Sequence, residues 1–272
     1  MNILPLVLAL ALILAVLTVE KSENFKNHVV VQIEYQNFLK NNDRQAFNAR
    51  QRTLFYGKNQ SDIKQLSFRY FIDKNAKESY ASAAKQYRLL ILALMQNLYS
   101  EANFFKKIEE KRSDFLSELL VAIEEAAAKA PKNLIKREED ISRLKLDDAE
   151  LHEAFYNMLK GTISREHFDK NPSEAVKKKQ YVSLFYFINY EGTTHPPRIE
   201  IQKAPREILK VVFKNDDDIV EKIIARRAEL AEKEENGNSL IFQNEFLQHR
   251  TNDIDDQLLD FKITAGDKTK YN

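Results

Sequence analysis

The sequence opens on the run Ile3-Leu4-Pro5-Leu6-Val7-Leu8-Ala9-Leu10-Ala11-Leu12-Ile13-Leu14-Ala15-Val16-Leu17-Thr18-Val19. It carries no charged side chain, and Thr18 is its only polar one. A helix of this length reaches roughly 25 Å at ~1.5 Å per residue, close to the ~30 Å of a bilayer's hydrocarbon core. We therefore expect residues 1–20 to be a transmembrane signal anchor that meets lipid through residues 3–19.

Two alternatives to an anchor remain, a cleaved signal peptide and a buried core helix. A cleaved signal peptide carries basic residues before its apolar run and a small-residue cleavage site after it. Residues 1–4 contain no Lys or Arg, and Thr18-Val19-Glu20 does not match such a site. A core helix is rarely so long and so uniformly apolar.

Lys21 and Lys26 follow the run, which by the positive-inside rule favours a cytoplasmic body.

Composition narrows the functional classes. The 272 residues hold 42 Lys and Arg against 41 Asp and Glu, a formal charge of +1, so no overall field attracts nucleic acid and none is expected as a partner. The chain has no Cys, which excludes disulfides, thiol catalysis and Cys-based metal sites. Only five Gly are present, and no Gly-rich phosphate loop or nucleophile elbow occurs.

After the anchor, residues 21–56 have the spacing of a helix. Apolar residues recur at every fourth position, at Phe25, Val29 and Ile33. Neither Pro nor Gly interrupts Leu6 to Tyr56, so anchor and stem are expected to form one helix. Two short runs of strand-forming residues follow, at Arg52–Tyr56 and Leu66–Asp73, with a turn-like polar stretch between them.

Residues 57–190 are expected to form a helical domain flanked by short strands. Helical periodicity extends from Lys77 to Lys160. One apolar stripe consists of Tyr87, Leu90, Ile91, Leu94 and Leu98, and a second of Phe115, Leu119, Ile123 and Ala127. Asp147 and Glu150 have the spacing of a capping box at the start of a further helix, which carries Leu151, Phe155, Met158 and Leu159 and ends before Gly161.

The end of this domain is harder to assign. Asn171-Pro172-Ser173 predicts a helix start with Pro in the first turn. Residues Tyr181–Tyr190 are β-branched and aromatic, and either a buried strand or the end of a buried helix fits them. The stretch Glu191–Pro197 contains Gly192 and two consecutive Pro residues, which favours a domain boundary there.

Residues 196–272 are expected to form a small mixed module. Arg198–Gln202 alternates as a short strand, and Leu258–Thr264 reads as a final one. Pro205–Lys214 and Asp218–Ala231 have helical periodicity, and Asn236-Gly237-Asn238 is typical of a turn. The predicted fold class is therefore α+β and mostly α. It combines a long N-terminal membrane helix, a central helical domain and this small C-terminal α/β module.

No motif identifies a catalytic or metal site. His28, His152, His167, His195 and His249 have no metal-ligand spacing, and His152-Glu153 is expected to be a surface pair. Two acidic clusters are the candidates for a hard cation such as calcium, which binds several converging oxygens. They are Asp216, Asp217 and Asp218, and Asp253, Asp255 and Asp256. Solvated turns or helix caps are the alternative for both clusters, and no other cofactor is expected.

The two short helices of the C-terminal module suggest a unit of the helix–hairpin–helix type. The nucleic-acid-binding version presents backbone N–H groups of a Gly-containing hairpin to phosphate. Here the link is Phe213-Lys214-Asn215-Asp216-Asp217-Asp218, which is acidic and lacks Gly. The link would repel phosphate, so a structural or protein-binding unit is expected.

This module resembles the C-terminal part of the minor pseudopilin K family of bacterial type II secretion systems. The resemblance rests on a strand at Ile199–Gln202, a lead-in at Lys203-Ala204-Pro205 and helices at Glu207–Phe213 and Ile219–Arg226, followed by a strand at Phe261–Thr264. Membership would imply an inner-membrane precursor that joins a short periplasmic fibre, and bound calcium occurs among pseudopilins. The family's leader has basic residues and a Gly, which Met1-Asn2-Ile3-Leu4 lacks, so processing stays open.

The sequence thus predicts a non-enzymatic, membrane-anchored subunit of a pseudopilus-like assembly. It would act by contacts with other membrane or pilin-like subunits. We expect a single-pass protein of the inner membrane, with a periplasmic body if the resemblance holds. A signal-anchored adaptor unrelated to secretion is the alternative, and a membrane-bound hydrolase that uses carboxylates is a third.

Overall fold

The computed structural model describes residues 66–131, 134–136, 138–163, 165–170, 172–190, 196–232 and 238–263. The chain divides into two compact units, Met1–Gly57 and Lys58–Asn272, and all described residues belong to the second. The predicted anchor at residues 1–20, the stem at 21–56 and the predicted strand Arg52–Tyr56 lie outside the described residues. Within the described part, no helix is both long and apolar enough to cross a bilayer.

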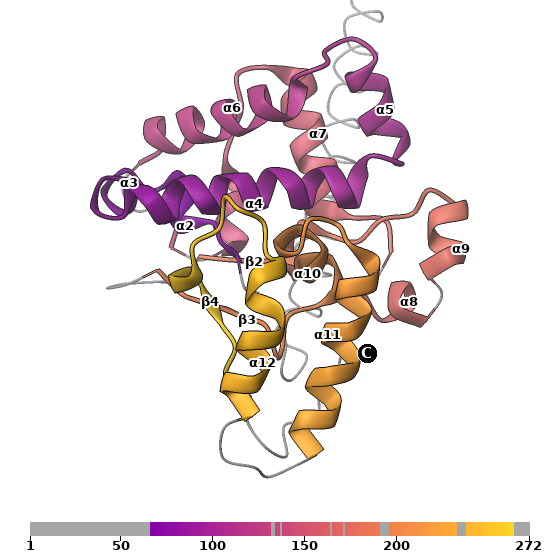
Figure 1. Ribbon diagram of the computed structural model, residues 1–272. Coiled ribbons are helices and arrows are strands. Elements are labelled where there is room, and N and C mark those ends of the chain that lie inside the picture. Colours follow the sequence, from indigo (N-terminus) through magenta and orange to yellow (C-terminus); the bar gives the residue numbers. More distant parts are fainter. Residues whose placement is uncertain are drawn as a thin grey trace, which may run out of the picture. The chain divides into compact units, whose positions relative to one another are not determined.

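The described unit is mostly helical, as predicted, with four very short strands (Figure 1). Its helices are α2 (Arg69–Ile72), α3 (Lys74–Ser79), α4 (Ala81–Tyr99), α5 (Asn103–Glu109), α6 (Phe115–Lys129), α7 (Ala149–Lys160), α8 (Arg165–Lys170), α9 (Pro172–Lys177), α10 (Arg206–Val212), α11 (Asp217–Glu232) and α12 (Asn238–Phe246). Its strands are β1 (Leu66–Ser67), β2 (Ile188–Asn189), β3 (Ile199–Glu200) and β4 (Leu259–Asp260). Turns of 3-10 helix lie at Glu138–Arg143, Leu184–Tyr186, Leu247–His249 and Asp256–Leu258.

Helix α4 is the centre of this unit. In Figure 1 it runs across the unit, with α6 on one side and the C-terminal helices on the other, and it packs against α2, α3, α6 and α10. The predicted stripe is buried at Tyr87, Leu90, Ile91 and Leu94, while Leu98 is only half-buried. Burial of such side chains stabilises the fold by about 1.5–3 kcal/mol each. Helix α4 precedes the expected domain boundary at residues 191–197, and α10 follows it. Helices from both sides of that boundary therefore pack together.

Helices α6 and α7 confirm the other two predicted apolar faces. Phe115, Leu119 and Ile123 of α6 are buried, while Ala127 of the same stripe is only half-buried. Leu151, Phe155, Met158 and Leu159 of α7 are all buried. The start of α7 is one residue later than predicted. Asp148, not Asp147, is the N-cap, and its Oδ1 accepts the N–H groups of Glu150 and Leu151. The end before Gly161 is confirmed, because Gly161 has φ +63° and a Cβ there would lie 2.6 Å from the Ser183 nitrogen.

The strands form two separate parallel pairs, β1 with β2 and β3 with β4. Leu66 is opposite Ile188, and Ile199 is opposite Leu259. The prediction of a strand over Leu66–Asp73 is wrong after Ser67, because α2 begins at Arg69. Tyr70, Phe71 and Ile72 are all buried, so this segment shows no alternation of buried and exposed faces. Asp73 then ends the run by capping α3 through its side chain.

The segment Tyr181–Tyr190, for which strand and helix were both open, is neither throughout. Its middle is a turn of 3-10 helix at Leu184–Tyr186, followed by β2. Ser183 starts the turn, since its Oγ accepts the N–H of Phe185. Every residue from Val182 to Asn189 is buried, which explains why periodicity could not separate the alternatives.

The C-terminal helices α10 and α11 confirm the two predicted ones, and Pro172 does begin α9. Helices α8 and α12 were not predicted. For α12, the sequence of Asn236-Gly237-Asn238 suggested only a turn, yet the helix starts at Asn238. The predicted strands Arg198–Gln202 and Leu258–Thr264 are both shorter than expected, because β3 covers only Ile199–Glu200 and β4 only Leu259–Asp260. The described part of the expected strand Phe261–Thr264, residues 261–263, is therefore not a strand.

Candidate functional site

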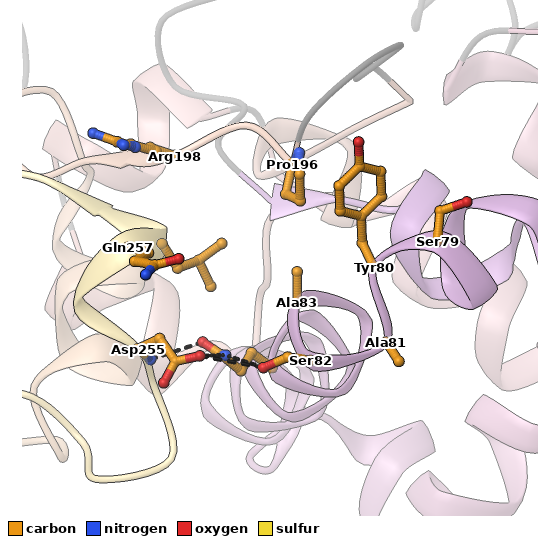
Figure 2. Close-up of a pocket in the computed structure, with 11 residues that line it drawn as sticks. Ser79, Tyr80, Ala81, Ser82, Ala83, Pro196, Arg198, Asp255 and Gln257 are labelled. Atoms are coloured by element: carbon orange, nitrogen blue, oxygen red, sulfur yellow. Dashed lines mark hydrogen bonds between the residues drawn. The ribbon is translucent and has the colours of Figure 1, made fainter.

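A pocket of about 500 Å³ lies where the start of α4 meets the segments before β3 and before β4. Figure 2 shows Ser79, Tyr80 and Ser82 on one side, and Asp255 and Gln257 on the other. Pro196 and Arg198 lie at its upper edge in that view. The pocket therefore lies where the central helices and the C-terminal segments meet.

The floor of this pocket is a hydrogen-bonded pair, Gln86 and Asp255. The Asp255 N–H donates to Gln86 Oε1 at 2.8 Å, and Gln86 Nε2 donates to Asp255 Oδ2 at 2.5 Å. Ser82 Oγ donates to the same carboxylate oxygen at 3.2 Å. Gln86 is 6% exposed, and its Nε2 also donates to Ser82 Oγ at 3.1 Å. The pair ties α4 to the loop before β4.

A second contact joins the same regions. The hydroxyl of Tyr87 donates a hydrogen bond to the carbonyl of Pro197. Burial, together with the neighbouring Tyr70, raises the pKa of Tyr87 well above its ordinary value. The hydroxyl therefore stays protonated and serves as a donor, not as a base. Both contacts join α4 to later segments of the chain.

A second pocket, of about 440 Å³, lies between the end of α4 and the start of α10, and we call it the α4–α10 pocket. Its lining includes the apolar or aromatic side chains of Leu98, Phe168 and Tyr181. Its charged rim is largely paired. Lys210 contacts Asp217 at 2.7 Å, and Glu207 contacts Arg165 at 2.9 Å.

The first candidate cation cluster is used for helix capping and ion pairing. Asp216 Oδ1 accepts the N–H groups of Asp218 and Ile219, so Asp216 is the N-cap of α11. The Lys210 amine, by a hydrogen bond and its charge, lowers the pKa of Asp217. Asp218 is exposed. Asp216 and Asp217 therefore serve different contacts, a helix cap and an ion pair.

The second cluster is also divided. Asp255 belongs to the contact with Gln86, and Asp256 Oδ1 lies 2.6 Å from Arg250. Asp253 is exposed. Across the described ranges, no group of three or more His, Asp or Glu side chains could hold a metal ion. Calcium binding by either cluster stays a prediction.

His152 of the predicted surface pair is only half-buried and has a defined contact. The N–H of Leu146 donates to its Nδ1 at 3.4 Å, so the ring helps to position the segment before α7.

Sequence reasoning missed the buried cation Arg227 of α11. Arg227 is 0% exposed, and its NH1 donates to the carbonyls of Ala204 at 2.6 Å and Ile201 at 3.4 Å. Burial lowers the pKa of its guanidinium to about 10. Arg227 thereby holds the turn between β3 and α10 against α11. Arg227 shares a helix face with the buried Ile223 and Leu230 of α11. This helical spacing is the feature of the sequence that could have indicated that Arg227 is buried.

Comparisons of this chain with protein-family models, with curated proteins and with solved structures found no match.

Proposed function

We propose that this chain is a non-enzymatic, membrane-anchored subunit of a pseudopilus-like secretion assembly. Residues 3–19 would hold it in the inner membrane, and the described unit would make contacts with pilin-like subunits in the periplasm. This is the function implied by the resemblance of residues 199–264.

The observation that carries the proposal is the order of elements in the C-terminal module. A strand (β3), a turn and two consecutive helices (α10 and α11) follow one another in the order of the family that the sequence resembles. The later strand is β4 (Leu259–Asp260), which comes after α12 and just before the expected Phe261–Thr264. The parallel pairing of β3 with β4 brings the start and the end of this module together. Arg227 then fixes the turn that leads into α10.

A non-enzymatic role is supported by how the larger pocket uses its polar groups. Asp255 accepts hydrogen bonds from Gln86 and Ser82, and Tyr87 donates to a backbone carbonyl. Groups committed in this way hold two segments together and are poorly placed to exchange protons with a substrate.

Topology is the first test, and the absence of Cys makes it simple. A single cysteine at the exposed Lys222 of α11 (Lys222→Cys) would report the side of the membrane on which the body lies. We expect a membrane-impermeant maleimide to label this variant in spheroplasts without lysis. Labelling only after lysis would place the body in the cytoplasm and overturn the proposal.

The second test separates a pseudopilus subunit from the alternative, a signal-anchored adaptor unrelated to secretion. After gentle cross-linking and detergent extraction, we expect the full chain to co-purify with the pilin-like subunits of the same cell. Recovery of a periplasmic body without any pilin-like protein would favour the adaptor.

A further inference from the structure

Lysines concentrate where α5 meets the end of α9. Helix α5 contributes Lys106 and Lys107, and Lys177, Lys178 and Lys179 are consecutive at the end of α9 and just beyond it. The chain just beyond α9 contacts α5, because Lys179 Nζ donates to Asn103 Oδ1 at 2.9 Å. Since Asn103 and Lys107 are four residues apart on one helix, they share a face. Lys107 and Lys179 therefore lie on the same part of the surface.

Two of these five lysines are neutralised locally. Lys106 Nζ lies 2.6 Å from Glu101, and Lys178 Nζ lies 2.5 Å from Glu174. The other three, Lys107, Lys177 and Lys179, are exposed and form no ion pair among the residues that the structure describes, although the charge of Lys179 acts on Glu101. We call these three residues the lysine patch.

The lysine patch continues into the α4–α10 pocket. Lys179 lines that pocket together with Glu101, Leu98 and Tyr181. The hydrogen bond and charge of Lys106 lower the pKa of Glu101, and the charge of Lys179 adds to this effect. An apolar-walled cavity thus opens beside a surface of positive charge.

We propose that the lysine patch and the α4–α10 pocket together bind an acidic segment of a partner protein that carries one apolar side chain. The lysines would face the acidic residues, and the pocket would take the apolar one between Leu98, Phe168 and Tyr181. This proposal deepens the proposed function. It rests on that function in one respect, that the partner is a protein.

The shape of the site favours a peptide over a lipid surface. A flat layer of anionic headgroups would meet the lysines and leave the pocket beside them empty. A side chain of Leu or Phe size can enter a cavity of about 440 Å³ and exclude water from its walls. Neighbouring cations such as Arg206 and Lys210 already face Asp217, so the lysine patch supplies the unbalanced charge.

The test uses the full chain in detergent and a labelled Glu-Glu-Phe-Glu-Glu peptide, with binding followed by fluorescence anisotropy at low ionic strength. We expect saturable binding that weakens toward physiological ionic strength of about 0.15 M. Replacing the peptide's Phe by Gly, or its four Glu by Gln, should each lower the affinity by roughly tenfold or more.

On the protein side, the combined variant Lys107→Glu, Lys177→Glu and Lys179→Glu should lower the affinity for the same peptide by at least roughly tenfold. The matched control reverses three exposed lysines elsewhere, Lys85, Lys222 and Lys262, with the same change in net charge. It should bind the peptide like the wild type within about twofold. Circular dichroism of both variants checks that they fold.

Equal losses of peptide affinity in the two variants would show that only the net charge of the protein matters. That result would overturn the proposal. Absence of peptide binding would overturn the proposal as well. This holds also if vesicles of phosphatidylglycerol bind to the same lysines while the peptide does not. Peptide-induced or peptide-independent dimerisation in place of one-to-one binding would point to a second copy as the occupant and would also contradict it. None of these results bears on membrane topology or co-purification, so the proposed function is tested separately.

Discussion

Gln86 and Asp255 exchange two hydrogen bonds although 169 positions separate them in the chain. Each residue both donates and accepts, so the contact fixes the orientation of the Gln86 amide as well as its distance from the loop before β4. Ser82, one turn earlier on α4, adds a third hydrogen bond to the same carboxylate. Helix α4 thus holds the C-terminal loop by polar contacts at the larger pocket.

Replacing Gln86 by Leu should destabilise the described unit. The change removes both hydrogen bonds and leaves the Asp255 N–H without its acceptor, at a cost of about 1–3 kcal/mol. Because the chain has no Trp, far-UV circular dichroism in a urea titration is the suitable measurement. Gln257→Leu is the matched control, since Gln257 lines the same pocket but is exposed. Equal stability of the two variants would mean that the contact contributes nothing.

Arg227→Met should be destabilising by roughly 2 kcal/mol, because it leaves the carbonyls of Ile201 and Ala204 without their buried donor. Arg227→Lys should recover little of this loss, since an ammonium cannot reproduce the planar fork of the guanidinium. Stability by urea titration, with Arg226→Met at a more exposed position as control, checks both. A Lys variant as stable as the wild type would show that charge alone suffices.

Tyr99 should make the unit sensitive to alkali. Burial, and to a lesser extent the neighbouring Tyr181, raise its pKa well above the ordinary value of about 10. Above about pH 10 the unfolded chain therefore loses a proton that the folded chain keeps, so stability is full below that pH and declines as the pH rises.

Tyr99→Phe removes this proton and should flatten the decline above about pH 10. At neutral pH it should cost about 1–2 kcal/mol, because the hydroxyl contacts the carbonyls of Met158 at 3.1 Å and Val182 at 3.2 Å. Urea titrations across the alkaline range give both values. Parallel pH profiles for the variant and the wild type would contradict the assignment.

Much of the helical framework could be predicted from sequence because its helices are amphipathic. In α4, α6 and α7 the buried positions recur at helical spacing, and each helix is long enough for the pattern to repeat. The short elements could not be predicted in the same way. Helix α2 and strand β2 lie in segments buried on all sides, where no periodicity survives.

The sites were less predictable than the helices, because they depend on distant pairing. Local spacing grouped Asp253, Asp255 and Asp256, yet Asp255 contacts Gln86 and Asp256 contacts Arg250. Likewise, nothing near Lys179 in sequence indicates that it contacts Asn103. Contacts of this kind follow from the packing of whole elements, and a single sequence carries no direct record of them.

The link between α10 and α11 offers a change that should stabilise the protein. Lys214 has φ +59° and Asn215 has φ +58°, a left-handed conformation that costs a residue with a Cβ roughly 1–2 kcal/mol. The conformation is needed here, because it lets the Asn215 N–H reach the Lys210 carbonyl and end α10. Asn215 accepts a hydrogen bond from Asn97, whereas Lys214 is exposed and is the better position to change.

Lys214→Gly should therefore raise the free energy of unfolding by about 0.5–1 kcal/mol, the strain relieved less the added freedom of the unfolded chain. The same substitution inside a helix should act in the opposite direction. Lys222→Gly, at an exposed position of α11, should lower the free energy of unfolding by about 1 kcal/mol. Urea titrations of the two variants beside the wild type give the sign directly. A loss of stability in both variants would contradict the prediction. It would mean that the left-handed backbone at Lys214 holds no strain for glycine to relieve.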